Sequence, residues 1–501
     1  MQRRLGDIAQ FRDHPHEAQA QVLRTLLRTA QGTEWGKKYG FGDAITAAEF
    51  AQRVPINTYE QLYPALERVL QGEANVLWPG RVQWFAKSSG TTNARSKYIP
   101  VTRESLQEGH YRAGRDMTAL ATYHYPECKV LGGKTLSLGG THGPNPFRPA
   151  EPNSRVGDVS AVIMQNLPTW AEYIRTPPLE LALLDEWEEK IERIARHVLT
   201  QDVTVLAGVP TWMIVLLRRV VELAGVANIT EVWPNLHLFL HGAVAFGPYR
   251  ELFRQLIPRE QMHYLEIYNA SEGYLALQDE PNSEDLLLLL DHGIYYEFLP
   301  LDQLGQEHPR VCTLEEVEIG PRYALIISTN AGLWRYNIGD TVRFTSLAPY
   351  RIRIAGRTKH FLNAFGEEVV IENADAAIAA ACRATGATVR DFTAAPIYFN
   401  ASDTSRGGHQ WLVEFNVQPA DTEQFVAVLD DTLRQLNSDY DAKRHRDLAL
   451  VRPMLTIAPP GTFEQWLAGK GKLGGQHKVP RLSNSRELLE EILRLLPEEL
   501  V

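Results

Sequence analysis

The chain has 501 residues, a formal net charge of −10, and a composition of 44% hydrophobic and 22% charged residues. This length is too great for one compact core and predicts two to four domains, because a typical domain holds about 100–200 residues. The acidic balance, without a basic run, disfavours DNA or RNA as a partner, since nucleic-acid binders carry a basic face. A nucleotide, if bound, is expected to be a small-molecule substrate.

The cysteines and the N-terminus indicate a cytoplasmic protein. Cys128, Cys312 and Cys382 are far apart and form no CxxC pair, which argues against a disulfide framework and against a zinc site. The N-terminal segment has no apolar run typical of a signal peptide. Apolar runs such as 286–290 are far too short to cross a bilayer, so no membrane contact is expected.

The first 80 residues are predicted to be mainly helical. Leucines recur there at helical spacing, as in Leu23, Leu26 and Leu27. From about residue 82 the pattern changes to a short strand, 82–86, that enters a tight polar loop. A strongly periodic helix is expected at 178–199.

Strands and helices then alternate, which is typical of parallel α/β sheets. The expected strands are 203–207, 236–240 and 263–268, and the expected helices are 211–223 and one from about 249. Ligand sites in such sheets lie at the loops that leave the carboxyl ends of strands. The loops after these strands, and the loop at 87–92, are therefore candidate site positions.

The C-terminal part of the chain shows two further changes of pattern. Residues 285–355 are expected to be mainly β, with short strands at 286–290, 295–299, 324–328 and 341–345. A boundary follows near 356–360, and the rest alternates strand and helix and ends in a helix at 485–495. We therefore expect domains at 1–357 and 358–501.

Several well-known motifs are incomplete here. Gly133-Lys-Thr ends like a P-loop, but its first glycine is replaced by Cys128. The glycines of 469–474 match GxGxxG but open no βαβ unit. Asn269-Ala-Ser271-Glu-Gly273 lacks the first glycine of the hydrolase GxSxG elbow, which makes Ser271 a weak nucleophile candidate.

The loop Ser88-Ser-Gly-Thr-Thr92 offers hydroxyls and unobstructed backbone N–H groups, with Lys97 a short way on. Such a cradle suits a polyanion. Taken alone, a flexible surface turn rich in small polar residues explains the loop equally well. Asp340 and Arg357 are also candidates, because a carboxylate and a guanidinium suit ribose and phosphate oxygens. Taken alone, however, a turn-capping Asp and a surface Arg explain these two residues better.

Together these segments resemble the adenylate-forming superfamily, and more closely the auxin-responsive-promoter type of acyl-acid amido synthetases. The matching segments are Ser88–Thr92, Tyr268-Asn-Ala-Ser-Glu272-Gly-Tyr, Gly293–Pro300, Trp334-Arg-Tyr-Asn-Ile-Gly-Asp340, Gly356-Arg-Thr-Lys359, Asn437-Ser-Asp-Tyr440 and Gln476-His-Lys478-Val-Pro-Arg481. The resemblance runs from about residue 30 to 485. It departs from the family pattern at Asn93-Ala94, where a glycine is usual, and at Asn269, where a small residue is common.

The resemblance implies a fold and a role for each matching residue. The fold would be α/β, with a large N-terminal domain of α/β sheets, a β-barrel-like subdomain and a small mobile α+β C-terminal domain. Glu272 would bind Mg²⁺, Tyr268 would stack near adenine, Asp340 would hold the ribose, and Lys478 would be the mobile catalytic lysine. The implied ATP-binding residues are Ser88, Ser89, Gly90, Thr91, Thr92, Ala243, Tyr268, Asn269, Ala270, Ser271, Asp340 and Arg357.

The resemblance also implies a two-step reaction, in which ATP activates a carboxylic acid as an acyl-adenylate and an amino acid then takes the acyl group. Apolar or aromatic residues near the strand-end loops are candidates for the acyl pocket, although core packing explains each at least as well. These candidates are Tyr123, Val162, Met164, Thr211, Trp212 and Tyr274. Basic residues that would bind a second carboxylate of the acid are not obvious. An aromatic or medium-chain acid is expected.

Three other interpretations stay open. An acyl-CoA ligase would share the first step and use a thiol acceptor, although the C-terminal signature favours amide formation. A serine hydrolase would use Ser271, and a non-catalytic protein would only bind the nucleotide. The sequence gives neither the acid nor the amine, and we expect a monomer or a weak dimer.

Overall fold

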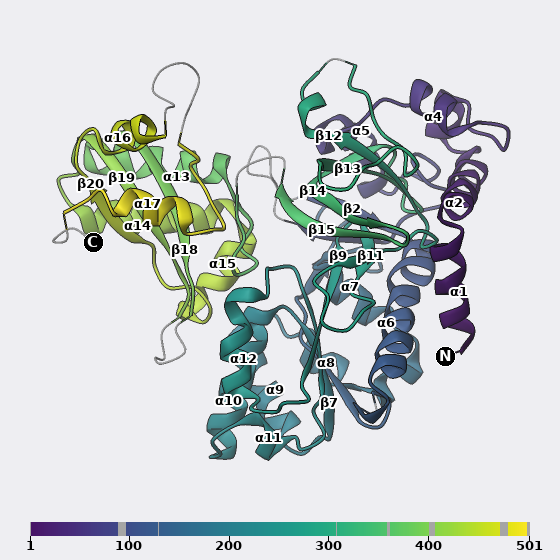
Figure 1. Ribbon diagram of the computed structural model, residues 1–501, viewed down its shortest axis with the longest axis horizontal. Helices are drawn as coiled ribbons and strands as arrows, with labels where there is room; N and C mark the ends of the chain where they lie inside the picture. The colour runs from purple at the N-terminus through teal and green to yellow at the C-terminus, as the bar shows by residue number, and fades with distance from the viewer. Residues whose placement is uncertain are drawn as a thin grey trace.

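The computed structural model describes residues 2–88, 97–128, 130–306, 308–357, 361–399, 406–470 and 479–497. The N-terminal segment is helical, as predicted, and its helices are α1 (Gln2–Asp13), α2 (Pro15–Ala30), α3 (Glu34–Tyr39), α4 (Ala47–Arg53) and α5 (Tyr59–Leu70). Helix α5 begins at Tyr59, directly after its N-cap Thr58, because the Thr58 and Gln61 side chains cap each other's backbone N–H groups. Its apolar side, with Leu62 and Leu66, is fully buried, so these helices form one wall of the molecule (Figure 1).

A small four-stranded sheet follows, with strand order β2-β1-β5-β4. Its strands are β1 (Trp84–Ser88), β2 (Lys97–Val101), β4 (His142–Pro144) and β5 (Arg155–Gly157). Strand β1 begins two residues later than predicted and runs antiparallel to β2, with Ser88 opposite Lys97. The helical elements between and after these strands are η1 (Ser105–His110), α6 (Tyr111–His124), η2 (Pro126–Cys128), α7 (Val159–Gln165) and η3 (Thr169–Tyr173).

The helix expected at 178–199 is two helices, α8 (Leu179–Ala182) and α9 (Trp187–Val198). A new helix starts because the Glu186 side chain accepts a hydrogen bond from the backbone N–H of Glu189, which satisfies a donor that an N-terminal turn leaves free. The break places Trp187 at the start of α9, where this residue lines a large cavity.

An eleven-stranded sheet runs through the molecule in the order β12-β13-β14-β15-β11-β10-β9-β8-β7-β3-β6. Its parallel part confirms the predicted β/α alternation: β3 (Lys134–Ser137), β6 (Arg175–Thr176), β7 (Val203–Gly208), β8 (Leu238–Gly242) and β9 (His263–Ala270). The connecting helices are α10 (Pro210–Ala224), α11 (Ile229–Val232) and α12 (Arg250–Leu256), with η4 (Gly247–Tyr249) before α12.

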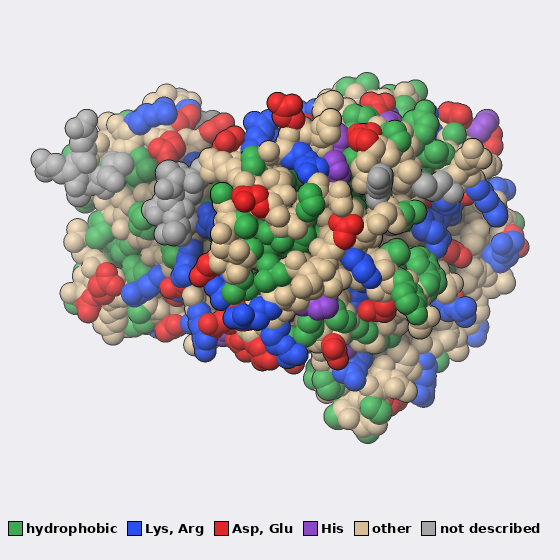
Figure 2. Space-filling view, turned by 90° about the horizontal axis from the view of Figure 1, so that it is seen from below, with side chains coloured by type: hydrophobic (Ala, Val, Ile, Leu, Met, Phe, Trp, Pro, Cys, Tyr) green, Lys and Arg blue, Asp and Glu red, His purple; other side chains and the backbone are tan. Residues whose placement is uncertain are grey.

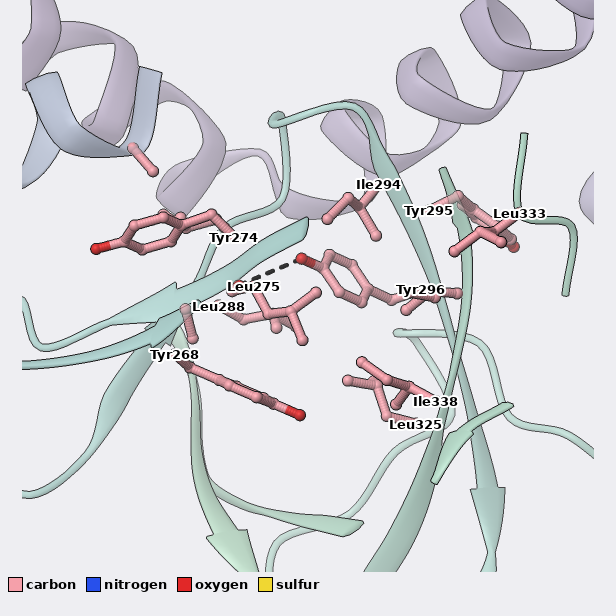
Figure 3. Close-up of a cluster of buried hydrophobic side chains, with 14 of the residues drawn as sticks. Tyr268, Tyr274, Leu275, Leu288, Ile294, Tyr295, Tyr296, Leu325, Leu333 and Ile338 are labelled. Atoms are coloured by element: carbon pink, nitrogen blue, oxygen red, sulfur yellow. Dashed lines mark hydrogen bonds between the residues drawn. The ribbon is translucent and has the colours of Figure 1, made fainter. Parts of the chain in front are cut away.

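The β-rich segment expected to form a barrel-like subdomain extends this same sheet with antiparallel strands. They are β10 (Gly273–Leu277), β11 (Leu286–Leu288), β12 (Ile294–Pro300), β13 (Arg322–Thr329), β14 (Tyr336–Leu347) and β15 (Tyr350–Arg357), with η5 (Leu301–Gln303) after β12. Figure 3 shows the core that joins the strands, where the buried Tyr296 donates from its hydroxyl to the Leu275 carbonyl at 3.2 Å. Because β9 and β10 are hydrogen-bonded neighbours in the sheet, the parallel and antiparallel parts form one continuous framework.

The C-terminal residues form a separate lobe in Figure 1. Its strands are β16 (Phe361–Leu362), β17 (Val369–Val370), β18 (Thr388–Ile397), β19 (Gly408–Val417) and β20 (Met454–Ala458), and β18, β19 and β20 make a three-stranded sheet. Its helices are α13 (Ile371–Thr385), α14 (Thr422–Leu436), α15 (Ser438–Arg444), η6 (His445–Asp447), α16 (Thr462–Gly469) and α17 (Glu487–Leu493). Mixed helices and strands are what the sequence predicts for this part.

The surface carries charges of both signs. On the face drawn in Figure 2, Lys and Arg side chains alternate with Asp and Glu side chains. Across the part of the chain that the structure describes, no helix has the length and apolar character needed to cross a membrane.

Candidate active site

A cavity of about 1560 Å³ lies where the carboxyl ends of the parallel strands meet the C-terminal lobe. The ends of β7 and β8 contribute Gly208, His241 and Gly242, and the C-terminal lobe contributes Asn363 and Lys443. This is the position at which α/β sheets bind ligands, because the loops leaving the strands converge there. The loops chosen from the sequence as candidate site positions therefore meet at one place.

The turn between β9 and β10 carries the predicted segment Tyr268-Asn-Ala-Ser-Glu272-Gly-Tyr, here called the second motif, into this cavity. Its cavity-lining residues are Tyr268, Asn269, Ala270, Ser271 and Glu272. The Tyr268 hydroxyl donates to a carboxylate oxygen of Asp340 at 2.5 Å, and both side chains are buried. Asp340 ends the predicted segment Trp334-Arg-Tyr-Asn-Ile-Gly-Asp340, here called the third motif, and also lines the cavity. The second and third motifs are therefore joined by a direct hydrogen bond.

Strand pairing sets the positions of Asp340 and Arg357. Asp340 lies in β14 and is the cross-strand partner of Arg357 at the end of β15. The side chain of Arg357 is outside the described residues. The strand register nevertheless places the backbones of Asp340 and Arg357 side by side. Their separation of seventeen residues in the sequence did not by itself predict this.

The loop after β8 is close to the C-terminal lobe. Gly242 has no room for a side chain, since a Cβ there would lie 2.4 Å from the Ile267 carbonyl oxygen. Ala243 has a φ of +71°, a left-handed conformation that non-glycine residues rarely adopt and that is enriched at functional sites. Its carbonyl accepts a hydrogen bond from Asn363 at 3.2 Å. Ala243, a predicted ATP-binding residue, therefore contacts both the cavity and the lobe.

Only part of the predicted phosphate loop lies in the described structure. Ser88 lines the cavity together with Lys87 and Lys97. The buried Lys97 lies over the ring of Tyr59, and its ammonium donates to the Tyr336 hydroxyl at 3.3 Å. Ser89, Gly90, Thr91 and Thr92 lie outside the described residues. The strand pair β1–β2 thus places a hydroxyl and two ammonium groups beside the cavity at the base of that loop.

Lys478 also lies outside the described residues, but the chain that follows it is anchored. Thr393 of β18 donates to the Pro480 carbonyl at 2.7 Å, and the Ala394 N–H donates to the Arg481 carbonyl at 2.9 Å. Pro480 and Arg481 therefore lie along β18 at the edge of the lobe's sheet, shortly after Lys478 in the sequence.

Glu272 is the residue that the sequence predicts to hold a magnesium ion. Glu272 is buried, lies in the β9–β10 turn and lines the cavity. Mg²⁺ prefers oxygen ligands and is usually held by one or two carboxylates together with substrate phosphates. A single carboxylate in the lining of a cavity that also includes Ser88 fits this mode of binding.

Burial sets the charge of two further groups on the cavity wall. Burial, with a smaller contribution from Arg250, lowers the pKa of His241 to about 3, so this ring is neutral at physiological pH. Burial, with a smaller contribution from the charge of Glu284, raises the pKa of Glu266 to about 7. Glu266, on β9, is therefore a cavity group whose charge changes near neutral pH.

The six acyl-pocket candidates are placed very differently by the fold. Trp212 lines the cavity and stacks on Trp187, with ring centroids 3.9 Å apart and an interplanar angle of 4°. Tyr123 is 67% exposed and lies outside the cavity lining. Val162, Met164, Thr211 and Tyr274 are buried in the core, and the Thr211 hydroxyl donates to the Phe365 carbonyl at 3.0 Å. Five of the six therefore do not reach the cavity lining. Their residue types could not show this, because apolar and aromatic residues form cavity walls and cores alike.

Ser271 has the wrong setting for a hydrolase nucleophile. A nucleophile elbow places the serine on a turn from a strand into a helix. Ser271 instead lies on the turn between the antiparallel strands β9 and β10. Among the described residues, no hydrogen bond joins its hydroxyl to a histidine. The fold therefore removes the structural basis of the hydrolase interpretation.

Two features of the site were not predicted. Lys443, on α15, lines the cavity and lies over the Trp212 ring at 5.1 Å; the one available signal was its spacing four residues after Asp439. Glu127, Cys128 and His263 bring ligand-type atoms within 4.8 Å of one another. The spacing argument against zinc did not foresee that group, because His263 is distant in sequence.

The fold defines the class of protein. The structure aligns with an acyl acid amido synthetase, GH3.15, solved in complex with 2,4-DB, at a TM-score of 0.59 and 17% identity over 96% of this chain and 93% of that chain. It also aligns with a 2-hydroxyisobutyryl-CoA ligase at a TM-score of 0.55 and 14% identity, over 96% of this chain and 92% of that one. The chain therefore has the fold of adenylate-forming enzymes, as predicted.

The family follows from the sequence comparisons. The chain matches the GH3 family N-terminal domain over residues 4–262, the central domain over 287–357 and the C-terminal domain over 372–487. It is 26% identical to the indole-3-acetic acid-amido synthetase GH3.8 of Oryza sativa subsp. indica, over 92% of this chain and 87% of that protein. It is 24% identical to the indole-3-acetic acid-amido synthetase GH3.4 of Arabidopsis thaliana, over 99% of this chain and 93% of that protein. The chain belongs to the GH3 family.

Proposed function

We propose that this protein activates a small carboxylic acid with ATP and transfers the acyl group to the amine of an amino acid. The observation that carries the proposal is the meeting of three ordered motifs at one cavity, in a chain of the GH3 family. Ser88, Glu272 and Asp340 come from separate elements and all line that cavity. GH3.8 and GH3.4 are named as amido synthetases.

In the first step, a carboxylate oxygen of the acid attacks the α-phosphorus of ATP and the bond to pyrophosphate breaks. Negative charge builds on the phosphoryl oxygens, and preorganised cations and hydrogen-bond donors stabilise it. Ser88, Lys87 and Lys97 supply such groups on the β1–β2 side of the cavity. Mg²⁺ held by Glu272 would neutralise phosphate charge when bound.

In the second step, the amine attacks the acyl carbon of the acyl-adenylate, the bond to AMP breaks and the amine loses a proton. We propose that residues 1–357 and 358–501 act as two domains, and that the smaller one rotates about Lys359 between the steps. Rotation about a few residues is a common way to change which groups close a site. In the conformation seen here, Asn363 of the lobe contacts Ala243 beside the cavity.

The first test is acid-dependent ATP–pyrophosphate exchange across a library of carboxylic acids. Exchange with at least one acid is expected, and its absence with all acids would contradict the proposal. Lys478→Ala should lower the exchange rate by about 10²–10³, the usual effect of removing one preorganised group. Unchanged exchange in that variant would show that Lys478 does not have the assigned role. The exposed Lys37→Met variant is the matched control.

A second candidate shares the first step and uses coenzyme A as acceptor. It stays in consideration because the fold also aligns with a CoA ligase. The fold does not separate the acceptors, whereas the match to the GH3 family C-terminal domain over 372–487 favours the amine. An assay that offers CoA against a panel of amino acids decides between them: amide formation is expected, and thioester formation alone would contradict the amide step.

A further inference from the structure

Helix α15 presents two opposite charges to the cavity on one side and is anchored on the other. Asp439 and Lys443 are four residues apart and both line the cavity, since residues at this spacing share one side of a helix. On the anchored side, Tyr440 and Arg444 donate to the buried carboxylate of Asp430, at 2.7 Å and 2.6–2.8 Å. The N-terminus of the helix is capped by the Asn437 side chain. The positions of Asp439 and Lys443 are therefore fixed by packing.

Lys443 is a largely buried residue whose ammonium faces the cavity, and its donors are not used within the described protein. Its side chain lies over the Trp212 ring at 5.1 Å and against Gly366, and the residue is 8% exposed. Among the described residues, its ammonium forms no ion pair and donates no hydrogen bond. Lys190 differs: that ammonium donates to the Gly139 and Gly140 carbonyls at 2.8 and 3.0 Å. Because this ammonium lines the cavity and has no partner among the described residues, Lys443 is suited to bind an anion that enters the cavity.

We propose that Lys443 binds the α-carboxylate of the amino acid acceptor. This inference rests on the proposed function and adds the subsite of the second substrate. Three anions would enter the cavity: the triphosphate, the carboxylate of the acid and the carboxylate of the acceptor. The triphosphate has Lys87 and Ser88 at the β1–β2 side. The acid loses its charge when it is activated, whereas the acceptor keeps its carboxylate through the reaction and in the product.

The charges around Lys443 match a zwitterion. A free amino acid carries an ammonium and a carboxylate a few bonds apart. Asp439, one helical turn before Lys443 on the same side of α15, supplies negative charge near the position that the amine would occupy. Trp212 places an apolar ring against the Lys443 ammonium. An apolar surface lowers the local dielectric constant and so strengthens the attraction between this ammonium and a carboxylate. An amine without a carboxylate would gain nothing from Lys443.

The experiment compares an amino acid with its carboxamide as acceptors in the wild type, Lys443→Met and Lys443→Arg. Lys443→Met should raise the KM for the amino acid about 10- to 100-fold, the range expected for a lost hydrogen bond to a charged group. The KM for the neutral carboxamide should not change, and pyrophosphate exchange should be retained. Lys443→Arg, which keeps the charge, should have a KM for the amino acid close to that of the wild type.

Two controls separate this proposal from the function on which it rests. Lys87→Met should impair pyrophosphate exchange. It should leave unchanged the ratio of the KM values for the amino acid and its carboxamide. Absence of exchange in the wild type would contradict the proposed function, whereas normal exchange with an unchanged amino acid KM in Lys443→Met would contradict the role of Lys443 alone. An equal rise in KM for both acceptors would also overturn it. Calorimetric binding of the amino acid to wild type and Lys443→Met gives the same comparison without turnover.

Discussion

Tyr268 and Asp340 are 72 positions apart in the chain, and their side chains form a 2.5 Å hydrogen bond at the wall of the cavity. The phenol comes from the end of β9 and the carboxylate from β14. In the eleven-stranded sheet, β10, β11 and β15 lie between these two strands. The carboxylate proposed to hold the ribose is therefore oriented by the residue proposed to lie near adenine.

Tyr268→Phe should weaken ATP binding. The substitution removes the hydroxyl that donates to Asp340, so the Asp340 carboxylate is no longer held in its orientation. The aromatic ring stays, so its apolar contacts are kept. A hydrogen bond to a charged group contributes about 1.5–3 kcal/mol, which corresponds to a rise in the KM for ATP of about 10- to 100-fold. Kinetics of pyrophosphate exchange at varied ATP concentrations measure it. An unchanged KM would show that the bond does not position the ribose site, and Tyr39→Phe in the N-terminal α3 is the control.

Arg335→Met should destabilise the fold. Arg335 lies within the third motif but does not line the cavity: it pairs with Glu297 at 2.9 Å and donates to the Ala51 and Val54 carbonyls, and both members of the pair are buried. Breaking a buried pair from one side leaves an uncompensated charge and costs about 3–5 kcal/mol. Urea unfolding followed by tryptophan fluorescence measures the loss.

The matched double variant is Arg335→Met with Glu297→Gln. It should be less destabilised than the single variant, because no unpaired charge is left in the core. The exposed pairs of Arg68 with Glu34 and Glu73 give a second comparison, and Arg68→Met should change stability much less. Equal losses at Arg335 and Arg68 would contradict the structural role given to the buried pair.

Glu266 should make stability depend on pH. Its pKa rises from 4.5 to about 7 in the folded protein, chiefly through burial. Between pH 4.5 and about 7 the unfolded chain has lost this proton and the folded protein keeps it, so stability falls as the pH rises. Above that range both states are ionised and the loss is constant.

Glu266→Gln removes this contribution. The melting temperature of wild type relative to Glu266→Gln should fall as the pH is raised from 4.5 to about 7 and then level off. The control is Glu17→Gln, whose side chain is 82% exposed. A difference that does not vary with pH would contradict the raised pKa.

Ser271 should not react with a fluorophosphonate probe. It lies on the turn between antiparallel strands, without the strand-to-helix elbow that exposes and activates a hydrolase serine. Mass spectrometry of the probe-treated protein should find no adduct on the 271 peptide. An adduct there that disappears in Ser271→Ala would revive the hydrolase interpretation.

The sequence by itself determined the class of fold and the order of the motifs. Alternating strands and helices predicted the parallel part of the large sheet, and β7, α10 and β9 lie close to the predicted ranges. These features are local, because periodicity and turn residues act over a few neighbours. The family resemblance rested on the same kind of local signal, and the domain matches confirm it.

The tertiary structure decided which side chains share the cavity. Trp212 reaches it while the neighbouring Thr211 is buried against Phe365, a difference of one position that residue type does not reveal. Lys443 reaches it because Asp430 anchors the opposite side of α15. Tyr268 meets Asp340 only because strands from distant parts of the chain enter one sheet. Local patterns fix which elements form, whereas long-range packing fixes which of their side chains meet.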